Sequence, residues 1–504
     1  MNAAASNLID RAAGVLLATA CGDALGAGYE RFPPLADDVP IAMVGRRSFA
    51  PGEWTDDTST AVTVAEAAAK RLDLRTGDGL DDVAEGFLRW YADGHKGIGR
   101  QTRAVLRASQ TGGSLAMTAA ARAYVKRNPH HSAGNGALMR TAAVALAYLD
   151  DPDGLIAAAR AVSDLTHADP TSGEACALWS FAIRYAVLYG TFDGLREGLA
   201  HLPGDRADHW AKLLDEAESK PPSAFDRNRW VEQALQGAWS AIVRTPVPLD
   251  DPGSGSFAAQ HVQLALEAAV RGGGDTDTVA AIAGGLLGAR WGVSAVPPLW
   301  RSEVHGWPGY RARDLVRLAV HAARRSLGHP ADDLAGWPSV SRIDYHGWHP
   351  HDHVVAHPHD PLVLLGSVRA LHRLPDGVDA VVSLCRLGVD ETPPSVQPRD
   401  HIEVRLVDAG PAENPHLSFV IDSAARAVAA LRQEGRTVLL HCVGGRSRTP
   451  IVAARYSVLA NGIDPAVALD EVIDVLPETD VNAELRSHFL RLGRYPTAAA
   501  SPIN

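Results

Sequence analysis

Residues 437–450 read TVLLHCVGGRSRTP, and this stretch decides how the last third of the chain folds. The run TVLL is short, apolar and partly β-branched, which is typical of a buried parallel strand. Pro450 suits the first turn of a helix that follows the glycine loop. Two similar runs, DAVVSLC (379–385) and EVRLVD (403–408), precede it. Because helical stretches at 417–434, 451–459 and 465–475 accompany these strands, we predict an α/β domain with a mainly parallel sheet over residues 361–497.

Upstream of this domain the hydrophobic period is helical and alternating runs are rare. Residues 1–335 are therefore predicted to form an all-helical domain, so the fold class is two domains. The segment 336–360 between them is rich in Pro, Gly and His and is predicted to be a connector. Its six histidines from His346 to His359 have no recurring ligand spacing, which favours a solvated or domain-packing segment over a metal site.

Composition excludes several classes of protein. The 504 residues carry 48 Lys+Arg against 59 Asp+Glu, a net charge of −11, which disfavours nucleic acid as a partner. Four cysteines without a CxxC pair indicate a reducing compartment. No apolar run reaches the ~20 residues of a membrane span, and Asp10 and Asp23 flank the one stretch that could pass for a signal peptide. We expect a cytoplasmic protein without a membrane partner.

The cysteine loop has the composition of an oxyanion site. A cysteine at the start of a helix beside guanidinium groups has a lowered pKa and can act as a nucleophile. The five residues between Cys442 and Arg448 let backbone N–H groups surround a phosphate, and Arg448 can clamp two of its oxygens. The Thr449 hydroxyl can assist the departing thiolate. The alternative is a small buried cysteine in a glycine turn.

This loop resembles the signature of the cysteine-dependent tyrosine phosphatases, most closely their dual-specificity group. His441, Cys442, Gly445, Ser447, Arg448 and Thr449 match the pattern, and Gly444 replaces its usual alanine. The resemblance implies a phosphomonoesterase acting on a phosphorylated protein or a small phosphoester, with Asp408, which ends a strand, as general acid. The alternative for Asp408 is a turn residue at a strand end. The implied substrate-binding loop is Val443, Gly444, Gly445, Arg446 and Ser447.

Two acidic clusters lie far apart in the helical part. EWTDDTSTAV (53–62) and GGGDTDTVAAIAGG (272–285) each place aspartates and a threonine at a helix start. Each alone fits an N-cap with acids in the first turn. Two such clusters of oxygen donors without Cys or His instead favour a shared hard cation, Mg²⁺ or Mn²⁺. Aspartates around one centre would repel each other without a cation.

The clusters resemble motifs of the ADP-ribosylglycohydrolase family. CGDALGAGYE (21–30), GEWTDDTSTA (52–61), SAGNGALMRTAAVAL (132–146), LTHADPTSGEACAL (165–178) and GGDTDTVAAIAGGLLGARWG (273–292) occur in family order. The resemblance implies an all-helical fold with two magnesium ions. Thr55, Asp56, Asp57, Asp275, Asp277 and Thr278 would be ligands, Glu30 the movable carboxylate at the ribose, Gly134, Asn135 and Gly136 the loop at the ADP-ribose, and His167 a residue near its phosphates.

Other residues of this part are expected to be structural. Asp23 is predicted to be a structural helix residue rather than a catalyst. The charged segment 203–230 is predicted to be an exposed helix and loop. The region 125–133, where family members present an aromatic ring to adenine, reads VKRNPHHSA and leaves adenine recognition open.

Together the motifs predict a bifunctional hydrolase. A magnesium-dependent domain would cleave an ADP-ribosyl N- or O-glycosidic bond in a modified protein or an ADP-ribose-containing metabolite, and a cysteine phosphatase would follow it. Two alternatives stay open. The helical domain could be a non-catalytic ADP-ribose reader that targets the phosphatase, or the two sites could process one phosphorylated ADP-ribose metabolite in turn.

Overall fold

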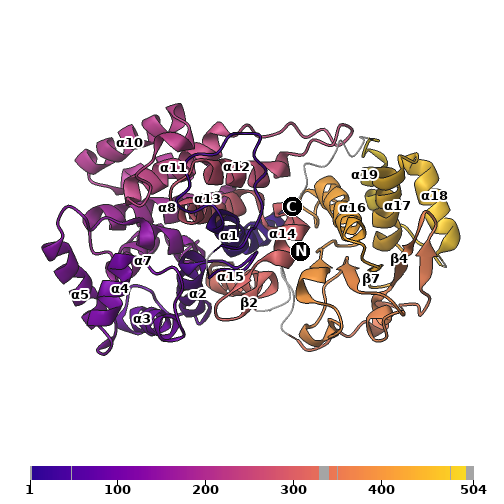
Figure 1. The fold of residues 1–504 in the computed structure, drawn as a ribbon, viewed down its shortest axis with the longest axis horizontal. Helices are drawn as coiled ribbons and strands as arrows, with labels where there is room; N and C mark the ends of the chain where they lie inside the picture. The colour runs from indigo at the N-terminus through magenta and orange to yellow at the C-terminus, as the bar shows by residue number, and fades with distance from the viewer. Residues whose placement is uncertain (1–2, 47, 328–339, 349, 477, 495–504) are drawn as a thin grey trace.

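The computed structural model describes residues 3–46, 48–327, 340–348, 350–476 and 478–494. Figure 1 shows a large group of helices, from indigo to pink, beside a smaller group in orange and yellow that contains the sheet. We call residues 3–327 the helical region and residues 340–494 the sheet region. The first four residues of the predicted connector lie outside the described residues.

The helical region is built from helices that cross around two central ones, α1 and α13. Its long helices are α1 (Ala3–Ala27), α2 (Asp56–Ala69), α3 (Gly77–Ala92), α4 (Arg100–Ala108), α5 (Gly113–Arg127), α7 (Pro152–Asp164), α8 (Pro170–Tyr189), α10 (Gly204–Ser219), α11 (Val231–Arg244), α12 (His261–Arg271), α13 (Thr276–Trp291) and α15 (Ala312–Leu327). Shorter helices are η1 (Asn135–Arg140), α6 (Ala142–Ala147), α9 (Gly194–Glu197) and α14 (Pro298–Glu303). A two-stranded hairpin, β1 (His305–Gly306) and β2 (Tyr310–Arg311), is its one departure from the predicted all-helical domain in the residues described.

The sheet region holds five strands in the order β3-β4-β7-β5-β6. Only the β3–β4 pair is antiparallel, so the predicted mainly parallel sheet is confirmed. The strands are β3 (Val355–His357), β4 (Asp360–Ser367), β5 (Ala380–Ser383), β6 (His401–Glu403) and β7 (Val438–Cys442). The helices are α16 (Leu417–Gln433), α17 (Arg448–Asn461), α18 (Pro465–Val475) and α19 (Ala483–Leu490).

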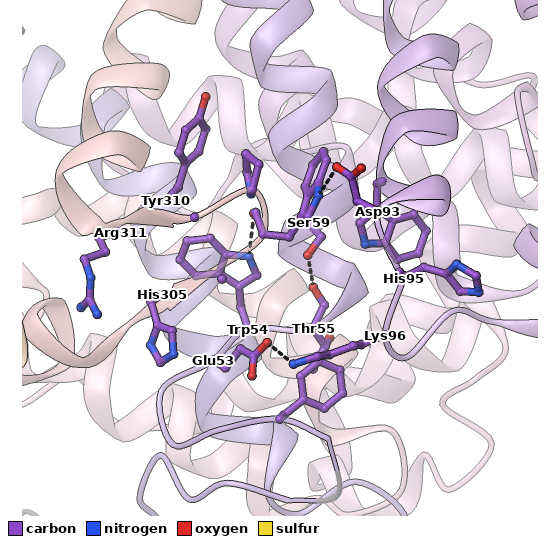
Figure 2. Close-up of a pocket in the computed structure, with 17 residues that line it drawn as sticks. Glu53, Trp54, Thr55, Ser59, Asp93, His95, Lys96, His305, Tyr310 and Arg311 are labelled. Atoms are coloured by element: carbon purple, nitrogen blue, oxygen red, sulfur yellow. Dashed lines mark hydrogen bonds and ion pairs between the residues drawn. The ribbon is translucent and has the colours of Figure 1, made fainter.

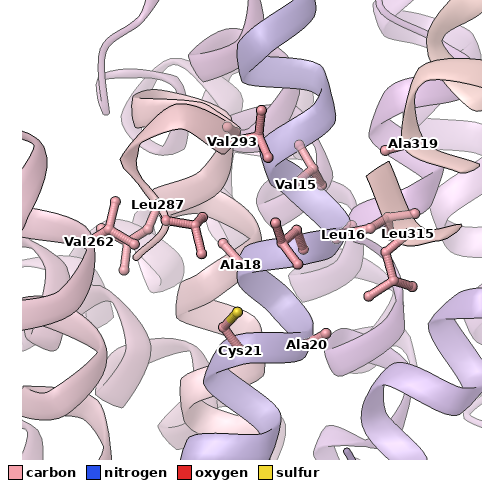
Figure 3. Close-up of a cluster of buried hydrophobic side chains, with 14 of the residues drawn as sticks. Val15, Leu16, Ala18, Ala20, Cys21, Val262, Leu287, Val293, Leu315 and Ala319 are labelled. Carbon is pink, nitrogen blue, oxygen red and sulfur yellow. The ribbon is translucent and has the colours of Figure 1, made fainter. Parts of the chain in front are cut away.

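Helices α1 and α13 pack with their backbones almost touching because glycines line the contact. A Cβ atom added to Gly14 would lie 2.5 Å from the carbonyl oxygen of Gly288, and one on Gly26 would lie 2.4 Å from that of Thr276. Figure 3 shows the apolar cluster around α1, with Leu16 and Cys21 among its buried side chains. This close packing brings the end of α1 against the start of α13.

Two strands differ from the sequence prediction. The structure places β3 and the first residue of β4 inside the segment predicted as a connector, where histidines and prolines hide the strand pattern. The strand predicted at 403–408 has its ladder only at His401–Glu403, and a single further bond from Val404 N to Ser383 O continues it. None of the helices in the described residues has the length and apolar character to cross a membrane.

Candidate functional sites

The two acidic clusters meet in one cavity of about 680 Å³ in the helical region. It lies where the starts of α2 and α13 face each other beside the end of α1. All eleven residues predicted for this site line the cavity: Glu30, Thr55, Asp56, Asp57, Gly134, Asn135, Gly136, His167, Asp275, Asp277 and Thr278. Segments separated by more than two hundred residues therefore form a single site.

Asp23 fixes the start of α2 from the neighbouring helix α1. Its Oδ1 accepts a hydrogen bond from Thr55 N at 3.0 Å, and its Oδ2 accepts from Thr58 N at 2.9 Å and Thr58 Oγ1 at 2.7 Å. These amides are among those that a helix start leaves without an intrahelical partner. Asp23 thus holds the loop before Asp56 and Asp57 in place, in agreement with the structural role predicted for it.

The carboxylates of the cavity repel one another in buried surroundings. Burial, and then the charge of Asp23, raises the pKa of Asp56 to about 7. The same two causes raise the pKa of Asp57 well above its usual value, and burial followed by Asp275 does so for Asp277. A cluster of this kind needs positive charge nearby if all its members are to ionise at neutral pH.

The donor chemistry fits a hard divalent cation. Asp57 Oδ1 is buried and has no hydrogen-bond partner in the described part of the chain, while its Oδ2 accepts from Thr55 Oγ1 at 2.8 Å. In the same described residues, no three acidic, His or Cys side chains lie close enough to form a ready-made metal cluster. The unpaired carboxylate oxygen and the all-oxygen donor set are nevertheless what magnesium or manganese binds.

The loop Gly134–Gly136 closes one side of the cavity against the ring of His167. A Cβ atom on Gly136 would lie 3.0 Å from His167 Cε1, so glycine lets the loop approach the ring. Burial lowers the pKa of His167 to about 3, which leaves it neutral. Arg140 Nη2 donates to Thr166 Oγ1 at 2.7 Å, so the Thr166 hydroxyl can direct its proton to His167 Nδ1, also at 2.7 Å. With Thr166 as donor to Nδ1, the proton of the imidazole lies on Nε2.

Sequence reasoning missed the contribution of residues 227–230 to this site. The segment 203–230 was predicted to be exposed, but its end lines the cavity. Arg229 Nη2 contacts Glu30 Oε1 at 2.8 Å and its Nε contacts Asp275 Oδ1 at 3.4 Å. Asn228 Oδ1 accepts from Asp275 N at 2.9 Å. The sequence around residues 227–230 has the pattern of a charged surface loop. Its role becomes visible only from the contacts of Arg229 with Glu30 and Asp275.

A second cavity, of about 520 Å³, adjoins the acidic one (Figure 2). The two share Phe49 and Thr55, which form part of a common wall. Trp54 is buried here and its Nε1 donates to Trp307 O at 3.3 Å. Lys96 pairs with Glu53 at 2.6 Å, and both residues line this cavity. This packing of Trp54 supports the neighbouring residue Thr55, which also lines the acidic cavity.

In the sheet region, Cys442 ends the central strand β7 and α17 begins six residues later at Arg448. Gly445 N lies 3.3 Å from Cys442 Sγ, and Gly445 has a φ of +74°, which glycine adopts without strain. Arg448 Nη1 donates to Leu384 O at 3.1 Å and to Leu406 O at 3.0 Å. Its Nε is buried without a partner among the described residues. The loop therefore places one backbone amide beside the thiol and begins α17 with a guanidinium group held by two carbonyl oxygens.

Asp408 lies at the mouth of this loop. Ser447 Oγ donates to Asp408 Oδ1 at 2.6 Å, and Asn482 Nδ2 donates to Asp408 O at 3.2 Å. The structure thus brings together the predicted nucleophile loop and the predicted acid. Thr449 is buried behind them, with its hydroxyl 3.5 Å from Gly366 O.

Histidines of the predicted connector pack against the sheet region. His357 is buried, with Nε2 3.1 Å from Ala453 O, and His359 Nδ1 lies 2.9 Å from Ser457 Oγ. A Cβ atom on Gly445 would lie 2.4 Å from His351 Nε2, so this ring borders the cysteine loop. These contacts support a packing role for the histidines of this segment. His349 lies outside the described residues.

The helical region thus carries a carboxylate-lined cavity between two helix starts. Residues 4–330 match the family model described as ADP-ribosylglycohydrolase, and the chain belongs to that family. The ADP-ribosylarginine hydrolase Tri1 of Serratia proteamaculans is 28% identical over 59% of this chain and 76% of its own. The ADP-ribosyl-[dinitrogen reductase] glycohydrolase of Rhodospirillum rubrum is 26% identical over 58% of this chain and 90% of its own.

The sheet region lies beyond residues 4–330, which the family model matches. The crystal structure of human DUSP28 aligns with 28% of this chain and 95% of that chain, at 24% sequence identity and a TM-score of 0.25. A score this low does not define the fold.

Proposed function

We propose that the helical region hydrolyses an ADP-ribosyl N- or O-glycosidic bond with the help of two magnesium ions, for which manganese can substitute. One observation carries the proposal: six oxygen-donor residues from two helix starts line one cavity together with Glu30, Asn135 and His167. The family to which the chain belongs and the names of its relatives support this chemistry. The substrate is an ADP-ribosylated protein or an ADP-ribose-containing metabolite.

The chain's own residues bind and orient this substrate. The Asp and Thr residues of the two clusters would hold the ions, and bound magnesium supplies Lewis acidity at the ribose. Asn135 Nδ2 donates to Asp275 Oδ2 at 2.7 Å and keeps that carboxylate oriented. Neutral His167 can donate from Nε2 to a phosphate oxygen. Glu30, at the rim and paired with Arg229, is the carboxylate available to accept a proton as the glycosidic bond breaks.

Product analysis by mass spectrometry tests this function. The full chain is incubated with proteins ADP-ribosylated on arginine or serine and with ADP-ribose conjugates, in magnesium and in chelator. We expect free ADP-ribose only in magnesium, and the substrate that reacts identifies the linkage. Tight ADP-ribose binding without release from any substrate would instead favour the non-catalytic reader.

We also propose that the sheet region hydrolyses phosphomonoesters through Cys442. The support is the arrangement of Cys442 Sγ, Gly445 N, Arg448 and Asp408 around one loop at the end of the central strand. The thiolate would attack phosphorus, the amides of residues 443–447 and Arg448 would bind the phosphate oxygens, and Asp408 would protonate the leaving group. The substrate is a phosphorylated protein or a small phosphoester.

Replacing Asp408 by asparagine tests the proposed acid. We expect Asp408→Asn to slow hydrolysis of alkyl phosphates about 10²-fold, because a poor leaving group needs protonation. Aryl phosphates with acidic phenols should change far less. Steady-state rates on both substrates measure the difference, with the exposed Asp474→Asn as the control. Equal losses on both substrates would count against Asp408 as the acid.

A coupled function for the two sites remains the alternative proposal. In it, the pair processes a phosphorylated ADP-ribose metabolite in two steps. A chain that dephosphorylates phosphopeptides but leaves ADP-ribose phosphates unchanged would exclude this version.

A further inference from the structure

Between the helical region and the sheet region lies a cavity of about 260 Å³ whose walls come from both. α14 and the start of α15 supply one wall, and the segment around β6 supplies the other. Four arginines line it, Arg301, Arg311, Arg313 and Arg405, against two carboxylates, Asp314 and Glu403. The cavity therefore has an excess of positive charge in a chain whose net charge is −11.

Both carboxylates already have partners. Glu403 pairs with Arg313 across the boundary, with Nε 3.4 Å from Oε2. Asp314 Oδ2 accepts from Arg311 N at 3.0 Å, and its Oδ1 lies 3.3 Å from Arg317 Nη2. Neither is left to balance the other two arginines.

Arg301 and Arg405 face each other from the two regions without an ion pair. The Nε atoms of both are enclosed and lack a hydrogen-bond partner among the residues that the structure describes. Both side chains also line a small adjoining cavity that contains Asp10 and Ser294. Ser294 Oγ donates to Asp10 Oδ2 at 2.7 Å, and Asp10 Oδ1 is buried without a hydrogen-bond partner among the described residues. The charge of Asp10 acts on both guanidinium groups, so a single carboxylate faces two arginines. An enclosed guanidinium group whose charge is not fully balanced is costly unless a further anion joins it.

The two histidines at this boundary add no negative charge to that of Asp10. His401 also lines the cavity, and its Nε2 lies 2.9 Å from Ser383 Oγ. His416 Nε2 contacts Trp291 O at 2.8 Å. Burial lowers the pKa of Arg301 to about 10, so its guanidinium stays charged at neutral pH.

We propose that this cavity binds a small dianionic oxyanion, inorganic phosphate or the phosphate of a small phosphomonoester, held by Arg301 from the helical region and Arg405 from the sheet region. The planar forks of two arginines match the oxygens of such an anion. The volume admits a phosphate or a small ester but is below that of most cavities for larger ligands. The anion would join the two regions at their contact.

The position of Arg405 links this site to the cysteine loop. Arg405 precedes Leu406, whose carbonyl oxygen accepts from Arg448 Nη1 at 3.0 Å, and Asp408 follows two residues later. An anion that orders Arg405 therefore also orders the segment that positions Arg448 and Asp408. Anion binding at this contact requires neither of the proposed activities.

Arginine-selective labelling of the full chain with phenylglyoxal tests the site directly. The rate at each arginine is followed by peptide mass spectrometry in phosphate, in glycerol 3-phosphate and in chloride at equal ionic strength. We expect phosphate at twice its dissociation constant to slow labelling of Arg301 and Arg405 about threefold. Exposed Arg107 on α4 is the internal control and should not change. Protection by glycerol 3-phosphate as well would identify phosphomonoesters as ligands, and unchanged rates at both arginines would overturn the proposal.

Thermal unfolding separates this site from the cysteine loop, which is also expected to bind phosphate. Phosphate should raise the Tm of the wild type and of Arg107→Gln by about 2 °C or more. The rise should become smaller in Arg301→Gln and in Arg405→Gln, while Arg448→Gln keeps the contribution of the interface. If the rise is the same in Arg301→Gln, in Arg405→Gln and in the wild type, the anion binds elsewhere and the proposal fails.

Discussion

Replacing Asp277 by alanine is expected to reduce magnesium-dependent release of ADP-ribose about 10²-fold or more. Loss of a residue that only supports a metal ligand typically costs 10- to 100-fold, and loss of a ligand itself should cost at least as much. Asp277 is buried at the start of α13, and burial together with Asp275 raises its pKa. Its negative charge is therefore expensive unless a cation shares the cavity. Initial rates on the substrate identified by product analysis measure the effect.

A stability measurement separates the loss of the metal from loss of the fold. Magnesium should raise the Tm of the wild type because it offsets the repulsion among the carboxylates. This rise should shrink in Asp277→Ala, whose Tm in chelator should equal or exceed that of the wild type. Asp226→Ala, an exposed acid on the loop that leads to the cavity, is the matched control. Unchanged magnesium-dependent release of ADP-ribose by Asp277→Ala would contradict the proposed metal site.

The sequence predicted the residues of the acidic cavity better than its walls. Asp56 and Asp277 could be found because each opens a helix within a short polar cluster, and the resemblance joined the two clusters. What makes them neighbours is the glycine contact between α1 and α13, in which Gly26 meets the backbone of Thr276. Arg229 had no such signal, since its role exists only through tertiary contacts with Glu30 and Asp275.

The strands of the sheet region were also only partly predictable from the sequence. The buried strands β5 and β7 were predictable from their apolar runs, but β3 and β4 were not assigned because histidines and prolines interrupt the pattern. Only the start of the strand predicted at 403–408 pairs in the sheet. The carbonyl oxygen of Leu406 instead accepts a hydrogen bond from Arg448. The cavity between the two regions could not be predicted from the sequence either. Arg301 and Arg405 lie more than a hundred residues apart and line one cavity only because the two regions pack together.

Replacing Cys442 by serine should lower phosphomonoester hydrolysis about 10³-fold or more, because the nucleophile is lost. The rest of the loop should still bind an oxyanion. Gly445 supplies its amide from a backbone whose φ of +74° does not depend on the thiol, and Arg448 is held by two carbonyl oxygens. Phosphate release from an aryl phosphate and equilibrium binding of tungstate measure the two properties separately.

The control for Cys442→Ser is Cys176→Ala, which removes another buried thiol from α8 in the helical region. We expect this variant to keep both turnover and tungstate binding. If Cys442→Ser instead keeps its turnover, the phosphatase activity of the chain does not use this loop, and the buried cysteine in a glycine turn becomes the correct reading. If Cys442→Ser also loses tungstate binding, the thiol is needed for the shape of the loop. The lost turnover then cannot be assigned to the nucleophile alone. Retained binding with lost turnover is the result that the geometry around Cys442 predicts.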